Sequence, residues 1–219
     1  MKSIPNNNPI STSNLIKIII LIFVIIIPIF SSGGYDHGTS TGRGQLELDF
    51  TWNPFDLIEF GQTYIVLGYG LTDHLDIHGY YAHPTEHQDN YYYGLFYQFV
   101  DSKYIDLATA AGRRHYTDSD VNDLFFPQLL FSLKIRNKLT IGGALVDINE
   151  IDSNKLRPRG TAFDVALYIP FSDVVKLPNY IHEIKLALGV FNPGVFDSDH
   201  GDFLPTYSID ITFIKLFKN

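Results

Sequence analysis

Four histidines lie close together in the sequence, and histidine is a common ligand of transition metals. They are His74, His78, His83 and His87. An extended chain would spread them over a turn, a strand and a loop, and no tight pair such as a helical H-E-x-x-H motif is present. We therefore expect no metal site and no cofactor.

Carboxylates gather in two stretches that contain oxygen ligands suited to calcium. One is residues 197–202, and the other contains Asp118, Asp120 and Asp123. Neither stretch follows the ligand spacing of an EF-hand loop. Acidic, solvated surface loops explain both stretches better than a calcium site does.

Nucleophilic catalysis would need a serine with a positioned histidine and an acid. Ser132 and Ser208 fall on the polar faces of expected strands, but no motif ties either of them to a histidine. Asp73 and His74 form an adjacent Asp-His pair, and it falls in an expected turn. The sequence predicts no catalytic residues and no enzyme.

The charge balance argues against a nucleic-acid partner. The chain has 16 basic and 24 acidic residues and a formal net charge of −8. Lys2 and Lys17 lie in the N-terminal leader, so the rest of the chain is still more acidic. Nucleic-acid binding needs clustered Lys and Arg. Cysteine is absent, so stability must come from packing and strand pairing rather than from disulfides.

Residues 1–34 are typical of a cleavable signal peptide. Residues 18–30 form an almost continuous apolar run, which is shorter than the roughly 20 residues of a membrane-spanning helix. Small residues follow it, with expected cleavage after Gly33 or Gly34. The alternative is an uncleaved anchor, which Pro28 and the lack of a basic stop-transfer cluster disfavour. The sequence thus predicts export from the cytoplasm.

Strict alternation of polar and apolar residues follows a Gly-, Ser- and Thr-rich stretch, residues 35–43, that we expect to be a flexible lead-in. Residues 207–213 (Tyr-Ser-Ile-Asp-Ile-Thr-Phe) show the alternation best. A period of two indicates a strand with one apolar and one polar face. Ten strands are predicted: residues 46–52, 63–71, 75–82, 91–100, 104–113, 125–135, 138–147, 161–171, 181–191 and 206–216.

The connections between these strands mostly alternate between short and long. Outer-membrane barrels have short turns at the periplasmic rim and longer loops outside. If the first strand rises from the periplasm, the short turns and both termini of the barrel chain lie on the periplasmic side. The longest outer connections are expected at residues 148–160, a charged loop, and at residues 192–205.

The polar face of almost every strand carries charged or hydrogen-bonding side chains. A basic side chain on the lipid face at the bilayer midplane costs about 2–4 kcal/mol, and an acidic one costs less. These polar faces must therefore point into the barrel, where we expect most of them to pair, for example Asp164 or Glu183 with Lys134 or Lys185. The candidate lumen residues are Glu47, Asp49, His78, Asp106, Asp164, Glu183, Lys185 and Asp210.

Aromatic residues on the opposite faces are expected at the two membrane interfaces. They are Trp52, Tyr69, Tyr81, Tyr91, Tyr93, Tyr97 and Phe213. Rings in such positions anchor a barrel in the bilayer, so we do not expect them to form a platform for stacking a ligand.

One part of the chain resembles a known family. Residues 45–48 (Gln-Leu-Glu-Leu) and 69–77 (Tyr-Gly-Leu-Thr-Asp-His-Leu-Asp-Ile) resemble the opening of bacterial outer-membrane transporter barrels, including the meta-pathway phenol-degradation group. The resemblance covers residues 45–82 and implies passive uptake of small molecules, hydrophobic ones included. The chain is shorter than is usual in that group and departs from its terminal phenylalanine, with Lys218 and Asn219 after Phe217.

The sequence predicts an all-β protein, a single antiparallel up-and-down transmembrane β-barrel of about ten strands, with eight or twelve as alternatives. Its expected location is an outer membrane, and its expected partners are the lipid bilayer, a small solute and the barrel-assembly machinery that this class implies. The leading function is a small channel or transporter-like barrel. A structural or surface-interaction barrel acting through residues 83–90, 148–160 and 192–205 is the second possibility. A secreted, soluble ligand-binding barrel is the third, and it requires aliphatic faces inside.

Overall fold

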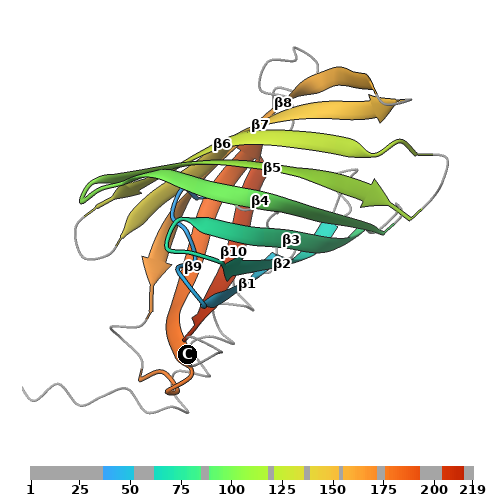
Figure 1. Cartoon of the computed structure of the whole chain (residues 1–219). Coiled ribbons are helices and arrows are strands. Elements are labelled where there is room, and N and C mark those ends of the chain that lie inside the picture. Colours follow the sequence, from blue (N-terminus) through green and yellow to red (C-terminus); the bar gives the residue numbers. More distant parts are fainter. Residues whose placement is uncertain are drawn as a thin grey trace, which may run out of the picture.

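The protein is a closed barrel of ten antiparallel strands, which confirms the predicted fold class. The computed structural model describes residues 37–51, 62–84, 89–117, 121–135, 139–152, 155–171, 176–192 and 204–214. The strands are β1 Leu46–Thr51, β2 Gln62–Gly70, β3 Leu75–Pro84, β4 Asn90–Asp101, β5 Ile105–Tyr116, β6 Leu124–Lys134, β7 Thr140–Asp152, β8 Lys155–Pro170, β9 Ile181–Asn192 and β10 Leu204–Phe213. Each strand pairs with its neighbours in the sequence (Figure 1).

The barrel closes where β1 pairs with β10. This seam has six register pairs, among them Glu47 opposite Thr212 and Asp49 opposite Asp210. Direct antiparallel partners share one face of the sheet, so the side chains of these two pairs point to the same face. Within the described part of the chain, no helix is long and apolar enough to span a membrane.

One end of the barrel carries tight connections. Residues 71–74 join β2 to β3, and residues 102–104 join β4 to β5. The amide of Leu71 donates to the carbonyl of Leu75 over 2.8 Å, which closes the first of these turns. The chain enters β1 and leaves β10 at this same end, which we call the short-turn end.

The prediction of a long loop at residues 148–160 is wrong. Strands β7 and β8 continue through it as a hairpin, paired as far as Asp152 opposite Lys155. A register shift between Ile148 and Asn149 marks the start of this extension. Ion pairs between Arg159 and Glu150, and between Arg157 and Asp152, join the two strands of the hairpin. The charges and Pro158 in this stretch are typical of a loop, but the cross-strand ion pairs stabilise it in an extended conformation.

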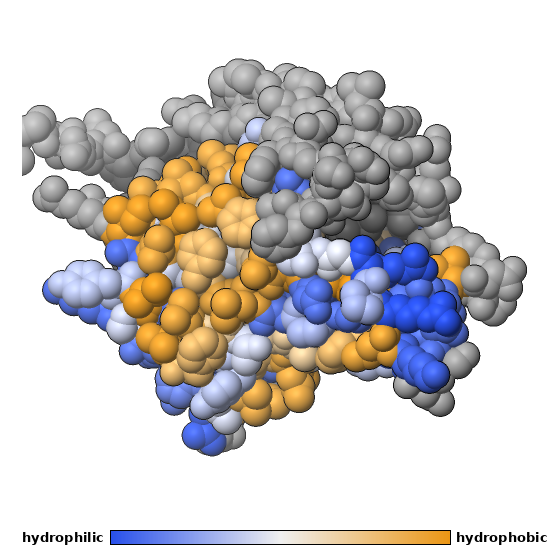
Figure 2. Space-filling view, turned by 90° about the horizontal axis from the view of Figure 1, so that it is seen from above, coloured by the Kyte–Doolittle hydropathy of each residue, from blue (hydrophilic) through white to orange (hydrophobic). Residues whose placement is uncertain are grey.

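The strands alternate between buried inward residues and exposed outward residues, and the outward residues are mainly apolar, as predicted. In β4, Asn90, Phe96 and Gln98 are buried, whereas Leu95 and Tyr97 are exposed on the outside. Large apolar side chains cover the described outer surface, and Figure 2 shows an apolar area of it with polar residues gathered at one end. The aliphatic faces therefore point outward, which is the reverse of what the soluble ligand-binding barrel requires.

The barrel interior is divided into an apolar part and a charged part. Alternation alone did not predict the apolar part, which packs on the inner faces of β2 to β7. Its buried members are Val66, Tyr80, Ala82, Tyr92, Phe96, Ala108, Ala110, Phe126, Leu130 and Ala144. Side chains fill the interior of narrow barrels, so this cluster acts as an internal core for more than half of the wall.

Candidate functional site

The eight candidate lumen residues all lie on the inner face of the barrel. Asp106, Asp164 and Asp210 have exposed fractions of 0%, 5% and 4%, and Glu47 and His78 are also buried. Asp49 is half-buried on β1 opposite Asp210. On β9, Lys185 lies opposite Asp210 and Glu183 opposite Thr212, so both share the inner face. The structure places these residues inside, and their role in passage stays a prediction.

The charged part of the lumen, which we call the charged wall, consists of the inner faces of β8, β9, β10 and β1. Lys185 Nζ lies 3.1 Å from Glu183 Oε2, so the predicted pairing between these two residues is present. The hydroxyl of Ser208 donates to Asp210 Oδ1 over 2.7 Å. Ala166, Tyr168 and Ala187 form a small apolar cluster on the same wall.

Lys134 and Asp164, which were also expected to form ion pairs in the lumen, have other partners. Lys134 on β6 pairs with Asp106 on β5, with 2.7 Å between Nζ and Oδ1. It also donates to the carbonyl oxygen of Ser102 over 2.8 Å. Asp164 instead accepts the backbone amide of Ala144 over 2.9 Å. Alternation fixes which face a residue occupies but not which residues of other strands lie near it, so the partner of Lys134 was not predictable.

An aromatic stack occupies the interior on the opposite side from the charged wall. The rings of His78 and Tyr92 stack with centroids 5.2 Å apart, and His78 Nε2 lies 3.0 Å from the Tyr92 hydroxyl. Tyr80 stacks on the same ring at 5.1 Å. The guanidinium of Arg114 lies 4.7 Å from the centre of the Phe126 ring, a cation–π contact. This stack fills the lumen beside β3 to β6 with ring surfaces and one cation.

Residues 37–43, which precede β1, lie inside the short-turn mouth of the barrel (Figure 1). The amide of Ser40 donates to Gln98 Oε1 over 2.9 Å, and the amide of Thr41 donates to Asp76 Oδ2 over 2.7 Å. The Thr39 hydroxyl lies 2.8 Å from Asp106 Oδ2. Sequence reasoning missed these contacts, since short polar residues carry no pattern that names a partner.

The first residue of this segment reaches the charged wall. His37 Nε2 lies 3.6 Å from Glu47 Oε1. Its ring meets the ring of Tyr168 on β8 edge to face, with centroids 5.4 Å apart. The segment therefore crosses the mouth from β3 to β8, and we call residues 37–43 the mouth segment.

Of the acidic residues that were considered for calcium, Asp123 lies within the described residues. Asp123 pairs with Arg113 and with His115, at 2.8 Å from His115 Nδ1. These ion pairs occupy a carboxylate that was considered for calcium. Asp118, Asp120, His87 and residues 197–202 lie outside the described residues. The described part of the chain contains no group of three His, Cys, Asp or Glu residues arranged to hold a metal ion.

The two serines have polar neighbours of other kinds. The Ser132 hydroxyl accepts the amide of Gly38 over 3.0 Å and lies 2.9 Å from the Thr39 hydroxyl. Ser208 donates to Asp210. The adjacent Asp73 and His74 lie in the turn between β2 and β3, where the carbonyl of Asp73 accepts the Ser40 hydroxyl. These contacts place Ser132 and Asp73 against the mouth segment.

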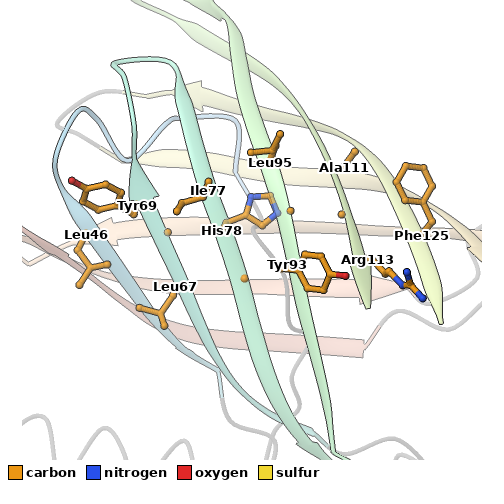
Figure 3. A pocket seen from close by; sticks show the side chains of 14 residues that line it. Leu46, Leu67, Tyr69, Ile77, His78, Tyr93, Leu95, Ala111, Arg113 and Phe125 are labelled. Atoms are coloured by element: carbon orange, nitrogen blue, oxygen red, sulfur yellow. The ribbon is translucent and has the colours of Figure 1, made fainter. Parts of the chain in front are cut away.

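The outer wall has a groove of about 720 Å³ across β2 to β6 (Figure 3). Leu67, Ile77 and Leu95 line it, and Gly79 and Ala111 form shallow positions between larger side chains. Its lining is mostly apolar, with Arg113 toward the end of β5 and His78 as the exceptions. An apolar groove on the outside of a barrel is suited to the acyl chains of surrounding lipid.

Comparison with known proteins identifies no family, and two solved structures that align with this chain share little sequence with it. No protein-family model matches the chain, and no curated protein matches it. A solved structure titled KdgM porin aligns with 5% identity over 78% of this chain and 98% of its own, with a TM-score of 0.43. The N-terminal β-barrel domain of Pseudomonas aeruginosa OprF aligns with 12% identity over the same shares, with a TM-score of 0.29. Neither title names the phenol-degradation group, so that resemblance stays a prediction.

Proposed function

We propose that this protein is an integral barrel of a bacterial-type outer membrane and passes small solutes passively, with a preference for cations. Export by a cleavable signal peptide, residues 1–34, is part of this proposal. The observation that carries it is the excess of carboxylates on the inner face of the barrel. The inward acidic residues are Glu47, Asp49, Asp76, Asp106, Asp164, Glu183 and Asp210, and the inward basic residues are Arg114, Lys134 and Lys185.

The outer surface supports the membrane location. Leu67, Ile77, Leu95 and Leu129 are exposed over two-fifths or more of their surface on the outside of the barrel. Removing one such side chain from water is worth roughly 1.5–3 kcal/mol, so a band of them favours a lipid environment. Most strands have 9 to 13 residues, which matches the roughly 9–11 residues of a tilted membrane-spanning strand.

The charged wall supports a path for cations along one side of the lumen. The aromatic stack fills the side next to β3 to β6, whereas the buried apolar residues on the wall of β8 and β9 are two alanines and Tyr168. Asp49 and Asp210 face each other across the seam. Fixed carboxylates along a narrow passage attract cations and repel anions.

The test is ion selectivity in a planar bilayer. The purified protein is first refolded in detergent, and folding is verified by heat-modifiable gel mobility. Under a potassium chloride gradient, we expect a reversal potential on the cation side. Asp164→Asn and Asp210→Asn should each reduce this preference, because each removes a negative charge from the lumen. Asp147→Asn, an exposed position on β7, is the matched control and should leave selectivity unchanged.

Two results would contradict the proposal. Release of the protein from whole membranes by carbonate alone would rule out an integral barrel. Conductance with equal selectivity in the wild type, Asp164→Asn and Asp210→Asn would remove these carboxylates from the path.

A second function is favoured by the filled interior. The stack of His78, Tyr92, Tyr80 and Phe126 and the seated mouth segment both occupy lumen volume. A barrel without conductance, acting as a structural or surface-interaction protein, would use such a core for stability. Folded protein that gives neither conductance nor solute-driven swelling of vesicles, in every variant, would support this second function.

A further inference from the structure

The mouth segment is attached by polar contacts to four successive strands. Its groups meet Asp76 on β3, Gln98 on β4, Asp106 on β5 and Ser132 on β6. Three of these bonds come from backbone amides of the segment, those of Gly38, Ser40 and Thr41, to side-chain oxygens of the lumen. Groups that line the lumen are thereby used to hold a piece of the same chain across its mouth.

The fit of the segment against the wall is tight at glycines. A Cβ atom at Gly38 would lie 2.7 Å from the Cα of Phe131 and 2.9 Å from the carbonyl oxygen of Asp106, both backbone atoms of the wall. A Cβ atom at Gly70 would lie 1.9 Å from the carbonyl oxygen of Gly42. The segment can lie this deep in the mouth only because these positions carry no side chain.

The base of the segment has the conformational freedom of a hinge. Gly42 has a φ of 91° and Gly44 a φ of 75°, a region that glycine adopts at low cost. These two residues flank Arg43, which forms a bridge to Gly70 at the start of the turn after β2. Rotation at Gly42 and Gly44 would carry residues 37–41 away from the mouth while β1 keeps its pairing.

The chemistry of the contacts makes release reversible. The mouth segment consists of His, Gly, Thr, Ser, Thr, Gly and Arg, so it buries no aliphatic side chain of its own. Water can replace each hydrogen bond that the segment makes, and the net free energy of such an exchange is small. A part of the structure held in this way opens at lower free energy than the barrel itself.

We propose that residues 37–43 form a built-in plug that closes the short-turn mouth and must swing out before solutes pass. This inference rests on the proposed function, because it describes the regulation of the same lumen. Closed, the plug places His37 between Glu47 and Tyr168 at the entrance to the charged wall. Open, it exposes the oxygens of Asp76, Gln98 and Asp106 to the passage.

A disulfide lock tests the plug directly. The chain has no cysteine, and the Thr39 and Ser132 hydroxyl oxygens are 2.9 Å apart, so the double variant Thr39→Cys, Ser132→Cys brings two thiols close enough for a disulfide. We expect the oxidised protein to lose its conductance and to regain it on reduction. The single variants Thr39→Cys and Ser132→Cys are the controls, and neither should respond to oxidant.

A second variant displaces the plug. Gly38→Val adds a side chain against wall backbone that cannot move aside, so we expect the segment to leave the mouth and the conductance to rise. In the Thr39→Cys background, Gly38→Val should also speed reaction of the cysteine with a polar maleimide, a readout that does not depend on conduction.

The results separate the two proposals. Equal conductance of the cross-linked and the reduced protein, or equal maleimide rates with and without Gly38→Val, would overturn the plug while leaving the channel in place. Absence of conductance in every folded variant, Gly38→Val included, would overturn the channel and with it the plug as its gate.

Discussion

Tyr92 is the residue on which the inner packing of β3 to β6 depends. Its ring lies between those of His78 and Phe126, and its hydroxyl accepts a hydrogen bond from Gln128 Nε2 over 3.2 Å. The ring lies flat against the wall at Gly112, where a Cβ atom would come within 2.4 Å of its Cζ. Glycine at this position gives the ring its space, which explains a small residue in the middle of a strand.

We predict that Gly112→Ala destabilises the barrel. The added methyl group would force the Tyr92 ring out of its stack, and overpacking of this kind costs about 1–3 kcal/mol. Urea unfolding in lipid vesicles, followed by tryptophan fluorescence, measures the loss. The double variant Tyr92→Leu, Gly112→Ala is the control, because it relieves the clash with the ring and keeps only the clash of the methyl group with the carbonyl oxygen of Tyr93. Additive effects of the two substitutions would show that the ring and the glycine are not in contact.

At this scale the sequence predicted faces but not partners. Alternation with a period of two placed Asp106, Asp164 and Asp210 inside, since one register decides the face for a whole strand. It could not show that Lys134 meets Asp106, because that pairing depends on the registration of β5 against β6. The inward Phe126 breaks the polar pattern of its strand, so the internal core was missed.

The β7–β8 hairpin is the element that departs most from expectation. Beyond Phe163, which pairs with Asn192 of β9, the described part of β8 contacts β7 as its neighbour in the sheet. The extension touches the rest of the barrel at β6, where Glu150 and Asn149 are register partners of Leu124 and Phe125. The amide of Ile151 also donates to the carbonyl of Asp123 over 2.8 Å, and Asn122 donates to Glu150 over 2.6 Å. It is thus attached to the wall at one side only.

We predict that the extension can be removed without loss of the barrel. Ile148 and Gly160 are register partners, so an Asn-Gly turn can replace residues 149–159 between them. The exposed ion pairs that disappear contribute at most about 1 kcal/mol each. The shortened protein should keep its heat-modifiable gel mobility, with Arg159→Ala as a milder companion. Failure of the shortened chain to fold would show that the hairpin is needed for closure.

Element boundaries were predictable where alternation was undisturbed. Strands β4, β5 and β9 lie within a few residues of their expected bounds. Residues 148–160 were mistaken for a loop because Pro158, Gly160 and the charges around them are signals that normally end a strand. Cross-strand ion pairs at Glu150 and Asp152 outweigh those signals, and a single sequence does not show them.

The molecule as a whole is inverted relative to a water-soluble barrel. Many of its charged residues point into the barrel, and its exterior carries Leu95, Tyr93 and Ile77 on neighbouring strands. A contiguous apolar surface of this kind marks contact with a membrane or another protein. Whether lipid or water surrounds this surface can be tested, because an added charge on it costs more unfolding free energy in lipid than in water.

We predict that Leu95→Arg costs about 2–4 kcal/mol of unfolding free energy in lipid vesicles, as expected for a basic residue near the bilayer midplane. Leu95 lies in mid-strand and is 55% exposed on the outside. The matched control is Tyr104→Arg, since Tyr104 is 68% exposed in the short turn after β4 and should cost about 0–1 kcal/mol near the interface. Equal, near-zero effects at both positions would mean that water surrounds the wall.

The pairing of the first strand with the last has a consequence for biogenesis. β1 contributes six register pairs to the seam, and its partners are residues 208–213, late in the sequence. During synthesis, a nascent chain that has not reached these residues presents two unsatisfied sheet edges. Until residues 208–213 pair with β1, both edges of the sheet stay open to pairing with another chain.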